Sequence, residues 1–143
     1  MRLVDVKIWQ HFYSKELIEE SLRIANVFKV NDEELVLLRP MFQLEGTDEE
    51  VCHWFMDQFD LRYLILTAGA EYSTIYARTE SSTLPTPKVK VADTVGAGDS
   101  FSGSFVAAIL AGKSLREAHQ HAVKVAAFVC TQHGAWPTYP KDL

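Results

Sequence analysis

The stretch DTVGAGDSF, residues 93–101, places two glycines directly before a long apolar segment. Gly96 and Gly98 let the backbone turn sharply and approach a bound group closely, because neither residue carries a Cβ. The apolar segment predicts a helix over residues 97–111. The N-terminus of such a helix presents unpaired N–H groups and about half a positive charge, which favours a phosphate or a developing oxyanion. We therefore expect an anion site where this loop becomes a helix.

Asp99 is the unexpected residue of this stretch, because a carboxylate would repel an anion bound beside it. One interpretation is chemical: an ionised carboxylate accepts a proton from an alcohol while the loop stabilises the phosphoryl group under attack. The other is structural: Asp99 stabilises the first turn of the helix, and the glycines form a tight strand-to-helix turn. The pattern by itself leaves both open. The P-loop pattern G-x-x-x-x-G-K-[ST] and the dinucleotide pattern G-x-G-x-x-G are both absent.

The composition is that of a folded protein, with 143 residues, 48% apolar and 23% charged. This length predicts a single domain over residues 1–143. A net charge of −5 and the lack of a basic cluster argue against nucleic acid or an anionic membrane as a partner. The longest apolar runs are shorter than the ~20 residues that span a bilayer. Cys52 and Cys130 match no metal spacing and are expected as buried thiols, so we predict a cytoplasmic protein.

Segments of period 2 and period 3.6 alternate along the chain and predict an α/β fold, with a parallel-type sheet flanked by helices. Strands are expected at residues 2–8, 27–30, 63–67, 73–77 and 89–91. The fourth of these strands should form a hairpin with the third. Residues 81–87 are rich in Ser, Thr and Pro and are expected to form turns.

Side chains that can cap a helix predict where four of the helices begin. Ser14 should begin a helix that ends near Ala25, with an inward face formed by Leu17, Ile18, Leu22 and Ala25. Asn31 is the second candidate cap. Capping boxes predict helices over residues 47–59 and over residues 114–130.

Residues 93–101 resemble the C-terminal signature of the ribokinase-like (PfkB) carbohydrate kinases, and the flanking sequence resembles the fructokinase branch. The resemblance continues through SFSGSFVAAILAGKSLREAHQHAVKVAAFVCTQHGAWP and, more weakly, back to the first strand. It covers nearly all of this chain but only the C-terminal, nucleotide-binding half of a full family member. It implies a ribokinase-like three-layer fold and ATP-dependent phosphorylation of a sugar hydroxyl.

The resemblance assigns roles to the residues of the loop. It implies that Asp99 is the general base that deprotonates the sugar hydroxyl. The amides of Gly96, Ala97 and Gly98 would form the anion hole for the γ-phosphate. Thr94 would contact ATP, and Asp93 would help to hold a monovalent cation such as K⁺.

Residues 31–34, Asn-Asp-Glu-Glu, resemble the N-x-x-E motif with which the family organises Mg²⁺ and phosphate. The resemblance implies an indirect role at Mg²⁺ for Asn31 and Glu34. The same two residues equally fit a helix start, with Asn31 as the N-cap and Glu34 as its reciprocal partner. The two interpretations are compatible.

Thr67 and Gly69 follow the clearest buried strand and resemble the nucleotide-phosphate turn that the family usually writes T-L-G-x-x-G. Tyr72 stands where the last glycine is usual, which questions the backbone conformation there and predicts a narrower nucleotide channel. Gly134 falls where the family closes around adenine and the cation. His121 would lie near that pocket, although a lone histidine on a helix is more often structural.

The sugar pocket and the lid of the family are built mainly from the half that has no counterpart here. The first strand also departs from the family pattern D-x-N-x-R, since Lys7 replaces Asn and Trp9 replaces Arg. The alternative is therefore a truncated, non-catalytic nucleotide-binding remnant or an interaction module of the same fold. The uncovered edge of the strand at residues 2–8 predicts a homo-oligomer.

Overall fold

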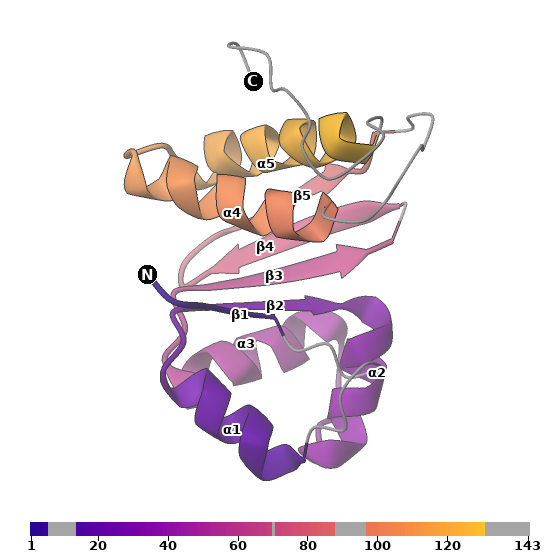
Figure 1. The fold of residues 1–143 in the computed structure, drawn as a ribbon. Helices are drawn as coiled ribbons and strands as arrows, with labels where there is room; N and C mark the ends of the chain where they lie inside the picture. Colours follow the sequence, from indigo (N-terminus) through magenta and orange to yellow (C-terminus); the bar gives the residue numbers. More distant parts are fainter. Residues whose placement is uncertain (6–13, 70, 88–96, 131–143) are drawn as a thin grey trace. The chain divides into compact units, whose positions relative to one another are not determined.

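The computed structural model describes residues 1–5, 14–69, 71–87 and 97–130 (Figure 1). The end of the strand predicted at residues 2–8 and all of that predicted at 89–91 lie outside these ranges. Within them, no helix is long and apolar enough to cross a membrane. The elements in chain order are β1 (Leu3–Asp5), α1 (Lys15–Arg23), β2 (Val27–Asn31), α2 (Asp32–Met41), α3 (Asp48–Phe59), β3 (Tyr63–Ala68), β4 (Tyr72–Ala77), β5 (Ser81–Pro85), α4 (Ala97–Leu110) and α5 (Leu115–Cys130).

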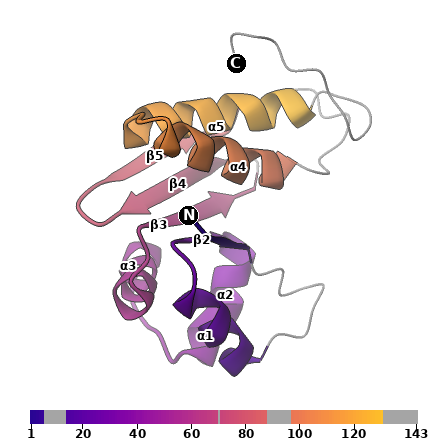
Figure 2. The same cartoon turned by 60° about the vertical axis from the view of Figure 1, so that its left-hand side comes forward.

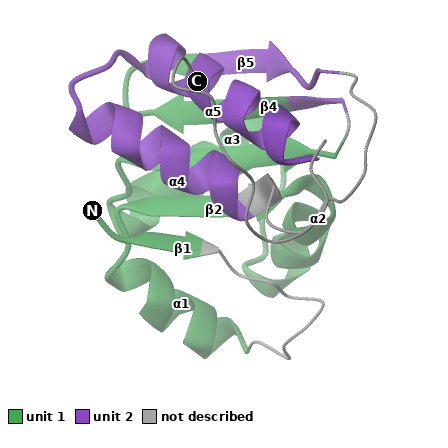
Figure 3. Ribbon diagram, turned by 45° about the horizontal axis from the view of Figure 1, so that its top comes forward, with its two compact units in different colours: residues 1–69, 73–81 green, residues 70–72, 82–143 purple. Residues whose placement is uncertain are grey.

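The chain divides into two compact units, which Figure 3 colours green and purple. Unit 1 consists of residues 1–69 and 73–81, and unit 2 consists of residues 70–72 and 82–143. The single domain expected from the length stays a prediction.

The sheet has the strand order β1-β2-β3-β4-β5, and its first three strands are parallel. Leu3 is the register partner of Val27, and Val27 is the partner of Tyr63. The arrows of β3 and β4 point in opposite directions in Figure 1, as expected for strands joined by a short connection. The predicted hairpin is therefore confirmed, and the sheet is parallel at its β1 end.

The core of unit 1 lies between its strands and the helices α1, α2 and α3, which lie together on one face of these strands (Figure 2). Phe55 of α3 lies at the centre, with its ring centroid 5.7 Å from that of Phe28 and 5.2 Å from that of Phe42. On α1, Ile18 and Leu22 are fully buried, as their spacing predicts. Leu17 was wrongly placed on this face: its side chain is 45% exposed, because it lies about 100° around the helix from Ile18.

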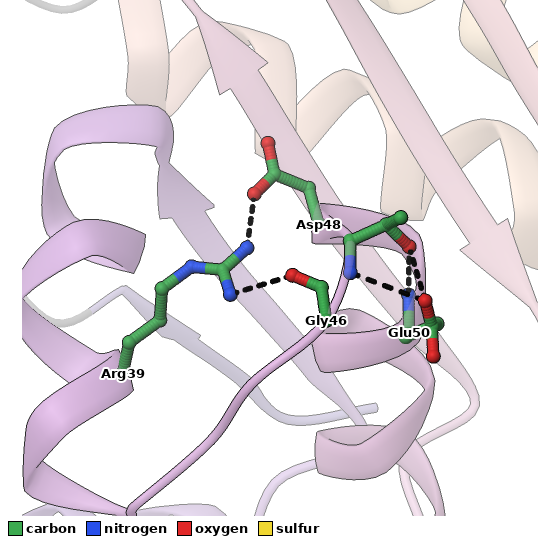
Figure 4. Close-up of polar contacts among 5 residues, drawn as sticks. Arg39, Gly46, Asp48 and Glu50 are labelled. Carbon is green, nitrogen blue, oxygen red and sulfur yellow. Dashed lines mark hydrogen bonds and ion pairs between the residues drawn. The ribbon is translucent and has the colours of Figure 1, made fainter.

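The predicted caps hold the helices of unit 1. The Ser14 hydroxyl accepts a hydrogen bond from the Leu17 N–H at 3.2 Å, and Thr47 and Glu50 form a complete capping box. Figure 4 shows how the connection before α3 is fastened: Arg39 donates to the Gly46 carbonyl at 2.8 Å and to the Asp48 carboxylate at 2.6 Å. These two hydrogen bonds connect the end of α2 to the start of α3 and so fix the loop between the two helices.

Within unit 2, α4 and α5 lie side by side in both views (Figures 1 and 2). Gly112 joins them with a φ of +90°, a conformation that favours glycine. The Ser114 hydroxyl accepts from the Glu117 N–H at 3.2 Å, which begins α5 where the sequence predicts. Hydrogen bonds from the hydroxyl and the backbone N–H of Ser114 lower the pKa of the Glu117 carboxyl.

The turns predicted at residues 81–87 were wrong for most of that segment, because residues Ser81–Pro85 form the strand β5. Its side chains alternate: Ser82 is buried, while Ser81 and Thr83 are exposed. Arg116 of α5 donates to the Thr83 carbonyl at 2.9 Å. Among the described residues, β5 ends the strand order, and Pro85 is tolerated there because an edge strand has N–H groups that need no partner strand.

The two cysteines are both free thiols, but only one matches the predicted burial. Cys52 is fully buried in unit 1, and burial raises the pKa of its thiol to about 12. Cys130, the last residue of α5, is only half-buried, because it stands at the end of its helix.

Candidate active site

Asp99 lies in the first turn of α4 and is exposed, so the helix begins where the glycine loop predicts. An exposed carboxylate at this place can meet an incoming hydroxyl group. The backbone of Ala97 and Gly98 belongs to the same turn. Gly96, Thr94 and Asp93 lie outside the described residues.

Phe101 anchors this first turn of α4. It follows Asp99 by two residues, so its side chain leaves the helix about 200° away from the carboxylate. Phe101 is 6% exposed, and Phe105, one turn further on, is fully buried. The helix therefore buries one side and presents Asp99 on another.

A second group of predicted residues meets at the carboxyl ends of two parallel strands in unit 1. Asn31 ends β2, and its register partner on β3 is Thr67. The N-x-x-E motif and the predicted nucleotide-phosphate turn are thus adjacent. In open α/β sheets this edge is where ligands bind.

Asn31 and Glu34 also form the predicted capping box. The Asn31 N–H donates to the Glu34 carboxylate at 2.9 Å, and the Glu34 N–H donates to the Asn31 side-chain oxygen at 2.7 Å. Glu34 is only 4% exposed. This locks both side chains at the end of β2, and the capping interpretation of the motif is confirmed. Within the described ranges, no three His, Cys, Asp or Glu side chains are grouped to hold a metal directly.

Gly69 follows β3 with a φ of +56°, in the left-handed region that glycine adopts most easily. A Cβ at Gly69 would meet no atom within 4 Å, so a bound group can approach its backbone. Tyr72 begins β4, is half-buried, and is not among the residues with positive φ. The extended backbone at this position therefore accepts the bulky side chain that replaces the usual glycine.

His119 of α5 is the residue of unit 2 that the sequence interpretation missed. Its ring is fully buried, and its Nδ1 lies 2.8 Å from the hydroxyl oxygen of Ser82 on β5. Arg116 donates to the same oxygen at 3.0 Å. Burial, together with the charge of Arg116, lowers the pKa of His119 to about 4, so the ring is neutral at pH 7.

A signal for His119 was present in the spacing of α5. Leu115, Ala118 and Ala122 form the buried stripe of the helix, and His119 falls within it. His121, the histidine assigned to the nucleotide pocket, is half-buried on the same helix. Gly134 lies outside the described residues.

Comparison with known proteins gives a consistent result. The family model described as pfkB family carbohydrate kinase matches residues 2–142. A ribokinase of Dictyostelium discoideum is 31% identical over 141 residues, which cover 88% of this chain and 44% of the relative.

Solved structures agree with this result. The nucleoside kinase of Methanocaldococcus jannaschii, an archaeal member of the ribokinase family, superposes with a TM-score of 0.76 at 26% identity, over 92% of this chain and 42% of its own. Fructokinase with bound ATP from Xylella fastidiosa gives a TM-score of 0.75 at 25% identity, over 93% of this chain and 46% of its own. The ribokinase-like α/β fold is confirmed, and the chain spans less than half the length of these proteins.

Proposed function

Because the chain belongs to the pfkB family of carbohydrate kinases, we propose that it takes part in the ATP-dependent phosphorylation of a sugar hydroxyl. The observation that supports this most is the exposed carboxylate of Asp99 in the first turn of α4, directly after a glycine loop. Glycine loops that enter helices bind anions, and an exposed carboxylate beside such a loop can accept a proton from an attacking hydroxyl.

In the proposed reaction, Asp99 takes the proton of the sugar hydroxyl as its oxygen attacks the γ-phosphorus of ATP. The amides of Gly96, Ala97 and Gly98 stabilise the negative charge on the transferred phosphoryl group, aided by the N-terminus of α4. General base catalysis of this kind contributes roughly 10²–10⁴-fold to the rate.

The nucleotide is assigned to Thr67, Gly69, Thr94, His121 and Gly134. The open space beside Gly69 and its left-handed backbone fit a phosphate that approaches the main chain. The side chain of Tyr72, which replaces the usual glycine, is expected to narrow the nucleotide channel.

The cations are assigned to residues at the ends of strands. Asn31 and Glu34 act on Mg²⁺ indirectly, since each already holds the other in the capping box. Asp93 contributes to the site of a monovalent cation such as K⁺. Magnesium supplies the positive charge that neutralises the phosphates in transfer.

The sugar is proposed to be a ketose of the fructose type, from the resemblance of the loop and its flanks to the fructokinase branch. The matched proteins act as ribokinase, nucleoside kinase and fructokinase, so ribose and nucleosides are the comparison substrates.

A second candidate function is nucleotide binding without turnover, as a remnant or interaction module of the same fold. It is favoured by Tyr72, Lys7 and Trp9, which stand where the family pattern has Gly, Asn and Arg. A homo-oligomer is proposed in both cases, because β1 ends the strand order and its outer edge has no partner strand among the described residues.

The two candidates are separated by measuring ATP binding calorimetrically and sugar-dependent ADP release in a coupled assay, for the wild type and Asp99→Ala. Glu16→Ala is the matched control, since Glu16 is another exposed acid in the first turn of a helix. The kinase proposal expects Asp99→Ala to bind ATP and lose turnover at least 100-fold, with Glu16→Ala unchanged. ATP binding by all three proteins, with turnover in none of them, supports the second candidate.

A further inference from the structure

We propose that His119 is a positioning residue for Asp99: it connects Ser82 of β5 to Phe101 of α4 and so fixes the turn that carries the carboxylate. The kinetic part of this inference rests on the proposed function, whereas the structural part does not. All four residues belong to unit 2.

The connection is made by buried groups. His119 is fully buried, and Ser82 and Phe101 are each 6% exposed or less. The hydroxyl oxygen of Ser82 lies 2.8 Å from His119 Nδ1, and the ring centroids of His119 and Phe101 lie 5.9 Å apart in an edge-to-face arrangement. Edge-to-face pairs are orientation-dependent, so the direction of the imidazole ring affects the direction of Phe101.

Arg116 gives the hydrogen bond its direction. Its guanidinium donates to the Ser82 oxygen at 3.0 Å and to the Thr83 carbonyl at 2.9 Å. A cation on the hydroxyl oxygen polarises its O–H bond, which favours Ser82 as donor and His119 Nδ1 as acceptor. The neutral ring then carries its proton on Nε2, and the hydrogen bond from Ser82 of β5 fixes the plane of the ring.

The link reaches the proposed base through the geometry of α4. Phe101 stands two residues after Asp99, within the same helical turn. A rotation or shift of this turn that releases Phe101 therefore moves the carboxylate by a similar amount. A displacement of about 1 Å at a reacting group costs roughly 100-fold in rate. The position of Asp99 thus depends on a hydrogen bond that involves neither substrate nor base.

Two substitutions of His119 test separately its hydrogen bond to Ser82 and its ring contact with Phe101. His119→Phe keeps a ring against Phe101 and removes the hydrogen bond to Ser82. His119→Asn keeps a polar atom near the place of Nδ1 and removes the ring. Ser82→Ala removes the hydroxyl group, whereas Ser82→Thr keeps it. Val125→Ala, a buried truncation on α5 outside the link, is the control for general loss of stability.

The first readout is amide hydrogen exchange across residues 101–106 of the full chain without substrate. These amides have helical partners, unlike the first N–H groups of α4. Both His119 variants and Ser82→Ala should lose protection here about tenfold or more, with residues 27–31 of β2 unchanged and Ser82→Thr close to the wild type. Val125→Ala should lower protection evenly along α4. Unchanged protection of residues 101–106 in Ser82→Ala and His119→Phe would overturn the proposal.

The second readout is the steady-state rate of sugar phosphorylation. Ser82→Ala and His119→Phe should each lower kcat about tenfold with less than a twofold change in KM for ATP. The double variant should be no slower than either single variant, because both remove the same hydrogen bond. Additive losses, or an equal loss in Val125→Ala, would overturn the positioning role. If exchange responds as stated while the wild type phosphorylates no sugar, the proposed function fails and the structural link stands.

Discussion

Acid should lower the free energy of unfolding of this protein through His119, by an amount set by the buried surroundings of its ring. The pKa of this histidine lies at about 4 in the folded chain, against 6.5 for an ordinary histidine, because the ring is buried and Arg116 lies near it. Between pH 6.5 and about pH 4, His119 therefore binds a proton in the unfolded chain but not in the folded chain. The contribution of neutral His119 is fully present above pH 6.5 and is lost as the pH falls towards 4.

The size of this loss is the pKa difference converted to free energy. A difference of roughly 2.5 units corresponds to about 3 kcal/mol, at about 1.4 kcal/mol for each pH unit. His119→Phe has no proton to bind and should lack this part of the pH dependence. Carboxylates titrate in both proteins and cancel in the comparison.

The assay is urea unfolding followed by circular dichroism at pH 7, 6, 5 and 4.5, for the wild type and His119→Phe. The wild type should lose about 2 kcal/mol more than the variant between pH 7 and 4.5. A constant difference in unfolding free energy between the two proteins over this range would show that His119 does not cause the loss of stability in acid.

Two substitutions and one labelling experiment test other parts of the structure. Asn31→Ala removes the side-chain oxygen that caps α2 and leaves the Glu34 backbone N–H without that acceptor, so the midpoint of thermal unfolding should fall, by about 1 kcal/mol or more in stability; an unchanged midpoint would contradict the capping box. Gly69→Ala meets no atom but must adopt a φ of +56°, so calorimetry should show a loss of about 1 kcal/mol from backbone strain alone, and a gain in stability would show that the backbone differs. In the native protein at pH 8, Cys52 should resist iodoacetamide while Cys130 reacts, because the first thiol is buried with a pKa of about 12; mass spectrometry of tryptic peptides decides this, and equal labelling would contradict the burial of Cys52.

The helices could be predicted from the sequence because their signals are local. Thr47 and Glu50 fix the start of α3 through a hydrogen bond over three residues, and α3 ends at Phe59, as predicted. The glycine loop similarly predicted that Asp99 lies in a first helical turn. In each case the physical cause and the sequence signal lie within a few positions of one another.

The errors arose where distant residues decide the structure. β5 was predicted as turns from its Ser, Thr and Pro content, but its strand is held by contacts of Ser82 and Thr83 with residues more than thirty positions later. His119 was missed for the same reason, since the sequence does not show that a serine faces it. Leu17 was predicted to face the core because an apolar helix face about 100° wide can include both Leu17 and its neighbour Ile18.

The candidate site was predicted in part. The register of β2 and β3 brings Asn31 beside Thr67, which two separate motifs could not establish from spacing alone. The roles of all the site residues stay predictions of the family resemblance, and residues 93–96 and Gly134 also lie outside the described residues.

Asp99 is proposed to serve phosphoryl transfer to a sugar hydroxyl. The most direct test is ³¹P NMR of the products formed from ATP, Mg²⁺ and fructose by the wild type and by Asp99→Asn, which keeps the size of the side chain and removes its basicity. The wild type should form a sugar phosphate ester together with ADP, and the variant should form it at least 100-fold more slowly while still binding ATP. Equal ester formation by both proteins, or the release of ADP with inorganic phosphate alone, would contradict the claim.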